Sequence, residues 1–154
     1  MPQTSAGILL YRRRTGIQVL LVHPGGPLWK KKDTGVWSVP KGLVHDGEEL
    51  LACACREFHE ETGMQPKGPF VQLTPVKLKS GKIVHTWACE GDINPADIRS
   101  NTFTMEWPPH SGRRMQFPEI DRGEWFGPEG AREKLSIQMM AVVEELLRKV
   151  EKNQ

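Results

Sequence analysis

Short apolar segments alternate with polar ones along the first quarter of the chain. Residues 5–11 and 17–23 are rich in branched apolar side chains, and the basic turn Arg12–Gly16 separates them. Segments of this length around a turn that contains glycine predict two β-strands. The three arginines of the turn are either an exposed hairpin tip or a contact for phosphate. Residues 36–39, which are mostly apolar, predict a third short strand that leads into Pro40-Lys41-Gly42.

The second half of the chain predicts further strands. Residues 70–79 and 82–90 have strand composition on either side of Ser80-Gly81, which is a hairpin signal. Pro75 predicts a bend or an edge position in the first of these strands. Residues 102–107 predict another strand, and residues 92–99 predict a loop with at most a helical turn. Residues 108–118 contain three prolines and one glycine and predict a long irregular loop.

The end of the chain predicts helices. Residues 128–135 begin one, and apolar positions recur at helical spacing through residues 137–150. The positions expected to cover the core are Ile137, Met140, Ala141, Glu144, Leu147 and Val150. Residues 151–154 are expected to fray. Strands before and after a central helix, followed by a C-terminal helix, predict an α/β fold with a mixed sheet between helices.

Length and composition are typical of one compact unit. A chain of 154 residues fits a single domain, 1–154. The 21 basic and 19 acidic residues nearly cancel, so net charge does not favour nucleic acid as a partner. The three cysteines form no CxxC pair and indicate reduced thiols. No apolar segment has membrane-spanning length, and no signal peptide is recognisable, so we expect a cytoplasmic protein without a membrane partner.

Carboxylates gather on the predicted central helix. Helical geometry places Glu57, Glu60 and Glu61 along one stripe, and a second, mostly apolar stripe can pack on the sheet. The second stripe consists of Leu51, Cys55, Phe58 and Thr62. Adjacent carboxylates repel one another unless cations lie between them, and hard oxygen ligands suit Mg²⁺ or Mn²⁺. Arg56 lies one turn from Glu60, where its guanidinium can orient that carboxylate.

The same segment carries a fixed spacing of residue types. Gly42 is followed after five residues by Glu48 and after seven more by the run Arg56–Met64, REFHEETGM. The helix is expected to begin among Asp46, Gly47 and Glu48, with Asp46 and Glu49 at capping-box spacing. Gly42 and Gly63 bracket it, which predicts tight turns at both ends. This pattern resembles the Nudix box, residue for residue.

The resemblance covers nearly the whole chain and implies a fold and a reaction. It implies the α/β/α Nudix sandwich with a central mixed sheet, and it points to a bacterial subgroup described as nucleoside triphosphate pyrophosphohydrolases. Members hydrolyse a nucleoside diphosphate linked to another group, with water attacking a phosphorus of the anhydride and divalent metal as cofactor. On this basis Glu57 and Glu61 are principal metal ligands, Glu60 is a further ligand or the base, and Arg56 orients them. Glu57 as both base and ligand stays open, and Glu48 shapes the loop.

Residues outside the helix extend the implied site. The backbone carbonyl of Lys41 is expected in the metal shell, and its side chain can touch phosphate. Glu119, in a segment that resembles the one supplying an acidic ligand from outside the box, is the candidate for that ligand. Four basic residues are candidate substrate contacts, although exposed strand lysines also protect sheet edges. They are Lys77, Lys79, Arg113 and Arg114.

Substrate and assembly stay open at this level. A nucleoside triphosphate or dinucleoside polyphosphate is expected as the small-molecule substrate. Tyr11 is the only tyrosine, so the downstream tyrosine of some dinucleoside tetraphosphate hydrolases is absent. The alternatives are an RNA 5′-end pyrophosphohydrolase, suggested by basic tips such as Arg113-Arg114, and a non-catalytic nucleotide-binding module, which would normally have lost box acids. A homodimer is possible.

Overall fold

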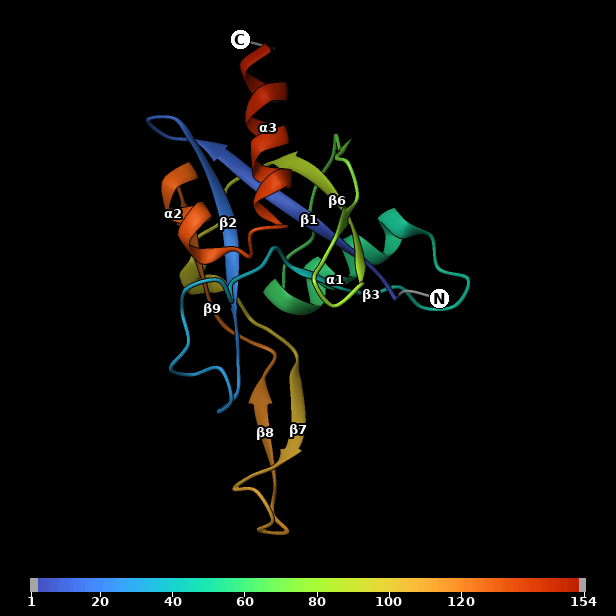
Figure 1. Ribbon diagram of the computed structural model, residues 1–154, viewed down its shortest axis with the longest axis vertical. Helices are drawn as coiled ribbons and strands as arrows, with labels where there is room; N and C mark the ends of the chain where they lie inside the picture. The colour runs from blue at the N-terminus through green and yellow to red at the C-terminus, as the bar shows by residue number, and fades with distance from the viewer. Residues whose placement is uncertain (1–2, 153–154) are drawn as a thin grey trace.

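A mixed β-sheet forms the centre of the fold. The computed structural model describes residues 3–152, and within them seven strands form one sheet in the order β4-β6-β1-β2-β9, with β3 paired to β1 and β5 paired to β6 (Figure 1). Strands β1 and β6 run parallel, and the other pairs are antiparallel. The strands are β1 (Thr4–Arg13), β2 (Ile17–Pro24), β3 (Lys41–Leu43), β4 (Val71–Gln72), β5 (Val76–Lys77), β6 (Ile83–Glu90) and β9 (Ile120–Phe126).

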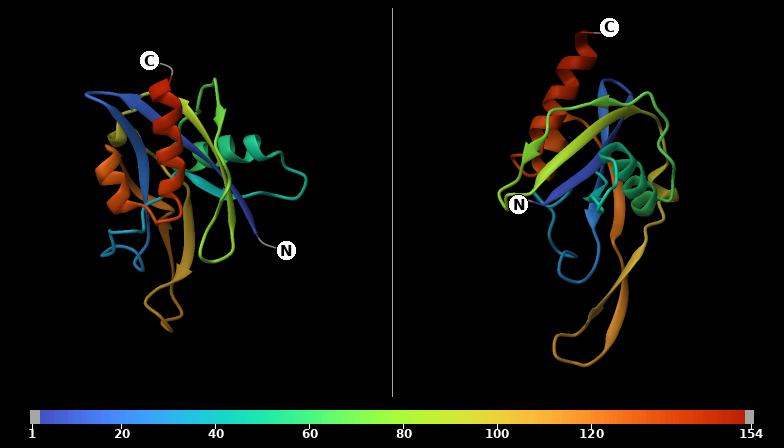
Figure 2. Two further views of the ribbon diagram at one scale, coloured as in Figure 1. Left: turned by 45° about the horizontal axis from the view of Figure 1, so that its top comes forward. Right: turned by 90° about the vertical axis from the view of Figure 1, so that its right-hand side faces the viewer.

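Helices cover the two faces of this sheet. Helix α1 (Leu50–Thr62) lies on one face, and α2 (Pro128–Lys134) and α3 (Met140–Lys152) lie on the other (Figure 2). Strand β1 contributes side chains to the cores on both faces of the sheet, because successive side chains of a strand point to opposite faces. Ile8 and Leu10 join Phe58 of α1 in one core, whereas Leu9 joins Val143 and Leu146 of α3 in the other. The predicted α/β/α sandwich with a mixed sheet is therefore confirmed.

A second, two-stranded sheet extends from the body of the molecule. Strands β7 (Thr102–Glu106) and β8 (Arg114–Pro118) pair antiparallel, and in Figure 1 they project away from the central sheet. A short 3₁₀ helix η1 (Pro95–Asp97) precedes them, as the helical turn expected in that region. The prediction of an irregular loop over residues 108–118 is therefore wrong for Arg114–Pro118. Its prolines lie in the connecting turn and at the last strand residue, where a missing N–H costs little.

One other strand prediction is wrong, and two are confirmed. Residues 36–39 form no strand, because only Ser38 makes an isolated bridge, to Val22, and the strand that leads to α1 is Lys41–Leu43 instead. The predicted bend at Pro75 is confirmed, since it separates β4 from β5. The hairpin at Ser80-Gly81 is also confirmed, with β5 and β6 antiparallel on either side of it.

Helix α3 presents a different stripe to the core from the predicted one. Met140 and Val150 are buried as expected, but Ile137 is 90% exposed and Ala141 faces solvent. The buried positions are Met139, Met140, Val142, Val143, Leu146 and Val150. Ile137 lies before the helix, so the periodicity begins later and the apolar face is rotated relative to the prediction. Residues 151 and 152 are helical, and residues 153–154, also expected to fray, lie outside the described residues.

None of the helices described within residues 3–152 combines the length and the apolar character needed to cross a bilayer. The three cysteines are free, in agreement with the predicted reduced thiols.

Candidate active site

Strand β3 and the loop after it deliver the chain into α1. The helix begins at Leu50 with Glu49 as its N-cap, and no side chain caps it. The predicted helix entry at residues 46–48 is therefore wrong, and the capping box between Asp46 and Glu49 does not form. Glu48 explains why the helix begins later than predicted. Its carboxylate accepts hydrogen bonds from the backbone N–H of His45 and from the side chain of Arg56, so Glu48 lies in the loop before α1.

Glycine is required at positions 42 and 63 of the box for two different physical reasons. Gly63 closes α1 in the left-handed conformation, with φ of 81°, and donates its N–H to the carbonyl of His59, as predicted for a tight turn. Gly42 instead lies within β3, so the turn predicted there is wrong. A Cβ at position 42 would lie 2.1 Å from Cδ of Glu57. Glycine is needed at this position because the Glu57 carboxylate packs directly against the backbone of β3.

Arg56 connects the acidic groups of the loop and the helix. Its Nε and Nη2 donate to the two oxygens of Glu48 at 2.8 and 3.0 Å. Its Nη1 donates to Glu57 at 2.9 Å and to Glu60 at 3.2 Å, and Nη2 also reaches the carbonyl of Leu43 at 3.2 Å. The bidentate pair lowers the pKa of Glu48 to about 2. The guanidinium therefore holds Glu48 ionised and restricts the rotamers of Glu57 and Glu60.

The predicted carboxylate stripe lies between α1 and the sheet. Glu57 and Glu61 are buried, and Glu60 is half-buried. Burial raises the pKa of Glu61 to about 9, and the charge of Glu57 adds to this shift. Burial and the neighbouring Glu60 raise the pKa of Glu57 as well. The site therefore places several carboxyl groups where their ionised forms are disfavoured unless a cation is added.

Glu119 joins this group from a distant part of the chain. It lies between β8 and β9, and its backbone N–H donates to the carbonyl of Asn101, whose own N–H donates to the carbonyl of Glu60. Burial and the charge of Glu60 raise the pKa of Glu119. Glu119 in turn raises the pKa of Glu57 and Glu61. The structure thus brings together four acidic residues that the sequence separates by up to 62 positions, from Glu57 to Glu119.

Lys41 lies at the edge of the same group. It pairs with Gly7 in the sheet, and its backbone forms a hydrogen bond to Glu61 that favours the ionised carboxylate. Burial lowers the pKa of the Lys41 ammonium, and the nearby Lys82 lowers it further. Lys82 is a neighbour that the sequence patterns did not indicate, because it approaches only through the β5–β6 hairpin.

The donor set fits a hard divalent cation. Glu57, Glu60, Glu61 and Glu119 offer carboxylate oxygens, the ligands that Mg²⁺ and Mn²⁺ prefer. The raised pKa values of Glu57, Glu61 and Glu119 reflect charge that such an ion would compensate. In the conformation of the described residues, Glu57 and Glu60 bind Arg56, and no three acidic, histidine or cysteine groups converge closely enough to share one ion.

Comparison with known proteins places this arrangement in a family. The family model described as the NUDIX domain matches residues 1–146. This chain belongs to the Nudix family. The Nudix box is the segment Gly42–Met64 that carries Glu48, Arg56 and the carboxylate stripe.

The curated relatives match this chain over only about a third of its length. Nudix hydrolase 10 of Arabidopsis thaliana is 52% identical over 54 residues, which cover 35% of this chain and 20% of that protein. An RNA pyrophosphohydrolase of Haemophilus influenzae is 40% identical over 58 residues, which cover 37% of this chain and 29% of that protein. The matched segment thus spans less than a third of the length of either relative.

Solved structures resemble the Nudix chain over almost its full length. A binary complex of Caenorhabditis elegans Ap4A hydrolase has a TM-score of 0.67 at 21% identity and covers 97% of this chain and 98% of its own. The NUDIX domain of Shewanella oneidensis NrtR, complexed with ADP ribose, has a TM-score of 0.62 at 14% identity and covers 99% of this chain and 88% of its own. At sequence identities this low, the similarity to these structures shows the fold alone.

Four predicted substrate contacts lie outside the carboxylate group. Arg113 and Arg114 are exposed at the far end of the β7–β8 hairpin, and Arg114 is five strand residues, or about 16 Å, from Glu119. Lys77 and Lys79 are exposed on and after β5, beside the hairpin that carries Lys82. Substrate binding by these four basic residues therefore stays a prediction.

The arginines of the β1–β2 turn are occupied by other partners. Arg12 and Arg14 bind the two oxygens of Asp92 at 2.8 and 2.7 Å, and Arg13 lies 3.4 Å from Glu90. Arg12 also stacks on Trp125, 4.2 Å from the ring centroid. These contacts support the first interpretation of the basic turn, as a charged hairpin tip.

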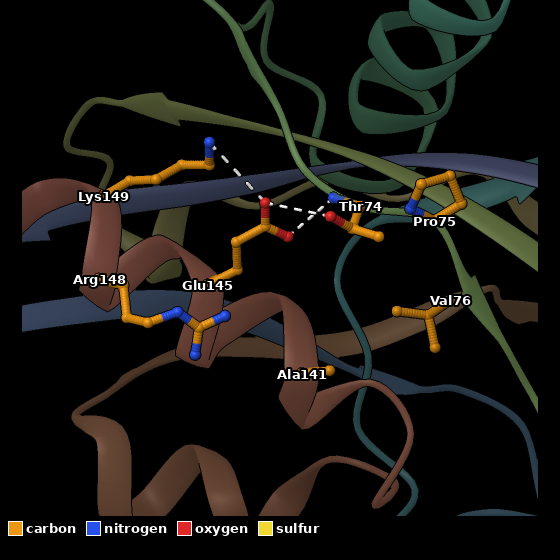
Figure 3. A pocket seen from close by; sticks show the side chains of 7 residues that line it. All are labelled: Thr74, Pro75, Val76, Ala141, Glu145, Arg148 and Lys149. Atoms are coloured by element: carbon orange, nitrogen blue, oxygen red, sulfur yellow. Dashed lines mark hydrogen bonds and ion pairs between the residues drawn. The ribbon is translucent and has the colours of Figure 1, made fainter.

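A cavity between α3 and the β4–β5 bend lies apart from the box. It has a volume of about 470 Å³ and is lined by residues that include Thr74, Val76, Glu145, Arg148 and Lys149 (Figure 3). Glu145 accepts the backbone N–H of Thr74 at 2.8 Å and its hydroxyl at 3.3 Å, and Lys149 lies 3.8 Å away. The contacts link helix to sheet and indicate a structural role.

Replacing Glu145 by alanine is expected to lower the free energy of unfolding by about 1 kcal/mol, because the N–H of Thr74 exchanges a charged acceptor for water. Thermal denaturation followed by circular dichroism measures the effect. Arg148→Ala changes an exposed residue of the same helix and should leave the Tm within about 1 °C. Equal loss in both variants would contradict a specific role for Glu145.

Proposed function

We propose that this chain hydrolyses a phosphoanhydride bond in a nucleoside diphosphate linked to another moiety, with a divalent metal ion as cofactor. One observation carries the proposal. Four carboxyl groups gather from α1 and from the β8–β9 junction. The ionised forms of Glu57, Glu61 and Glu119 are disfavoured there, and Arg56 binds Glu57 and Glu60. A polyanionic substrate and hard cations suit such a site better than any uncharged ligand.

The roles follow from position. Glu57 and Glu61, the most buried members of the stripe, would be the principal ligands to Mg²⁺ or Mn²⁺, and the carbonyl of Lys41 and the carboxylate of Glu119 would be further ligands. Glu60 is more accessible and serves either as a further ligand or as the base that takes a proton from the attacking water. Bound divalent ions supply positive charge to the phosphates and acidify water. Arg56 orients the carboxylates.

The substrate is a nucleoside triphosphate or a dinucleoside polyphosphate. Support comes from the fold of the Ap4A hydrolase, which matches nearly the whole chain, and from the ADP ribose that the NrtR domain binds. The amine of Lys41, beside the carboxylates, supplies a cation for a phosphate outside the metal shell.

A panel experiment tests the proposal. Phosphate or pyrophosphate release would be measured with Mg²⁺ or Mn²⁺ from nucleoside triphosphates, dinucleoside polyphosphates, nucleotide sugars, ADP-ribose and 5′-triphosphorylated RNA. Turnover of one class that requires the metal is the expected result. No cleavage of any class by folded protein would contradict the catalytic proposal and favour a nucleotide-binding module.

RNA with a 5′-triphosphate is a second candidate, because the local relatives include RNA pyrophosphohydrolases. The exposed side chains Lys30–Lys32 and Arg113-Arg114 would meet an RNA backbone. Cleavage of RNA should then weaken steeply with salt, whereas hydrolysis of a mononucleotide should not.

The buried carboxyl group of Glu61 predicts a pH-dependent stability. Its pKa of about 9 in the folded protein exceeds its ordinary value of 4.5, so between these pH values the folded state holds a proton that the unfolded state has lost. In EDTA, stability should therefore fall as pH rises from about 4.5 towards 9. Glu61→Gln removes this dependence, and its Tm should exceed that of the wild type at pH 8 but not at pH 4.

Differential scanning fluorimetry from pH 4 to pH 9 measures this difference. Addition of Mg²⁺ should raise the Tm of the wild type at pH 8 more than that of Glu61→Gln, because the ion binds the ionised carboxylate. A Tm difference that is constant with pH would show that Glu61 titrates normally.

A further inference from the structure

The β7–β8 hairpin has one apolar and one polar face. The pairs Phe103–Phe117 and Met105–Met115 lie opposite each other, and Trp107 continues their face. The other face carries Thr104, Gln116, Glu106 and Arg114. Within the described residues, the apolar face belongs to neither core of the sandwich. A two-stranded ribbon is marginally stable alone, so this face requires a covering.

The loop after β2 covers part of that face. The N–H of Gly25 donates to the carbonyl of Glu119 at 2.8 Å, and a Cβ on Gly26 would lie 2.8 Å from the ring of Phe103. Hydrogen bonds also tie the loop to the central sheet. The buried His23 of β2 contacts the loop carbonyl of Lys32 at 2.6 Å and the carboxylate of Asp121 in β9 at 3.0 Å. The loop and the hairpin therefore lie side by side as two walls (Figure 1).

A cleft remains between the two walls. Its volume is about 370 Å³, and it is lined chiefly by Pro27, Lys30, Trp107, Met115, Phe117 and Pro118. Met115 is 43% exposed, and Trp29 in the loop is 39% exposed. The volume falls within the range of small-molecule sites, about 300–1,000 Å³. The lining combines the rings of Trp107 and Phe117 with one amine, Lys30, and one carboxylate, Asp121. Such aromatic and apolar walls accept a flat aromatic ring.

The cleft adjoins the carboxylate group along the chain. Pro118 lines the cleft, and the next residue is Glu119. Hydrogen bonds from Glu119 to Asn101 and from Asn101 to Glu60 tie the base of the hairpin to the last turn of α1. One residue step of the chain, from Pro118 to Glu119, therefore joins the cleft to the acidic group.

We propose that the cleft between the loop Gly25–Gly35 and the apolar face of the β7–β8 hairpin binds the nucleobase of the substrate, with Trp107 as the stacking side chain. The inference rests on the proposed function, because it assigns the base of the same nucleotide whose phosphates meet the carboxylates. The base belongs either to a free nucleotide or to the 5′ end of RNA, since both present the same ring and phosphate.

Binding measurements test the cleft independently of catalysis. Isothermal titration calorimetry would compare nucleoside 5′-monophosphates with ribose 5-phosphate, which lacks the base, in the presence of Mg²⁺. The variants are Trp107→Ala, the conservative Trp107→Phe, and Gln116→Ala as a control on the opposite face of the same hairpin. Circular dichroism and sedimentation would verify fold and mass of each.

The expected pattern is specific to stacking. The nucleotide should bind more tightly than ribose 5-phosphate, and Trp107→Ala should weaken nucleotide binding about five-fold to hundred-fold without changing that of ribose 5-phosphate. Trp107→Phe should retain most of the affinity, and Gln116→Ala should match the wild type. Tighter binding of a 5′-phosphorylated oligoribonucleotide than of the mononucleotide would identify RNA as the source of the base, and equal binding would identify the free nucleotide.

Several results would overturn the inference. Unchanged nucleotide affinity in folded Trp107→Ala would do so, as would equal affinity of the wild type for nucleotide and ribose 5-phosphate. A change from dimer to monomer in Trp107→Ala, with nucleotide binding intact, would show that a second copy covers the face instead. If the protein hydrolyses nucleotides but the Trp107 variants are normal, the proposed function stands and this inference fails. If the protein binds nucleobases in the cleft but hydrolyses no nucleotide, the base-binding cleft stands and the proposed hydrolytic function fails.

Discussion

Replacing Glu61 or Glu57 by glutamine is expected to reduce metal-dependent hydrolysis by about 10³-fold or more, in line with the 10²–10⁴-fold that positioned acid–base groups contribute and the further loss of a metal ligand. Both carboxylates are buried against β3, so a neutral amide removes charge at a place that water cannot compensate. The variants should remain folded, because the amide has nearly the same size. Steady-state kinetics at saturating Mg²⁺ would measure kcat for the best substrate of the panel.

Glu49→Gln is the matched control for these variants. Glu49 is an exposed residue of the same box, at the N-cap of α1, and its side chain makes no capping hydrogen bond. The same chemical change there should alter kcat by less than about two-fold. Activity within ten-fold of the wild type in both Glu57→Gln and Glu61→Gln would remove the carboxylate stripe from the reaction.

Gly42→Ala is expected to lower kcat by about 10²-fold, while the free energy of unfolding changes far less. The added Cβ would lie 2.1 Å from Cδ of Glu57 and 2.3 Å from both carboxylate oxygens, so the side chain of Glu57 must move. A displacement of about 1 Å at a reacting centre costs roughly this factor. Kinetics and thermal denaturation of the same sample would separate the two effects.

Gly127→Ala gives a suitable comparison. Gly127 precedes α2 with φ of −73°, and nothing lies within 4 Å of the Cβ that alanine would add. This variant should retain activity, with at most a small change in Tm. If Gly42→Ala kept full activity, the close packing of Glu57 on β3 would have no part in catalysis.

The sequence was most informative where the interactions are local. Helical geometry alone places Glu57, Glu60 and Glu61 on one stripe and Arg56 within reach of Glu60, and the structure has this arrangement. Gly63 was also predictable, because helix ends commonly require the left-handed conformation that glycine adopts. The strands β1, β2 and β6 followed from their apolar runs.

Local patterns failed where a partner strand or a packing neighbour decides. Arg114–Pro118 contains proline and polar residues, and it becomes a strand only because β7 pairs with it. The stripe of α3 was misplaced because the face that packs depends on how the helix lies on the sheet, and Ile137 lies before its first turn.

By itself, the sequence determined the family, the layered fold and the acidic helix, because these depend on spacings within a short stretch of chain. The tertiary structure alone decided which side chain Gly42 makes room for and that the hairpin and the loop enclose a cleft. It also brought Glu119, which the sequence offered only as a candidate by resemblance, beside Glu60. Each of these depends on contacts between segments far apart in sequence, and no local periodicity records which distant side chain a residue will meet.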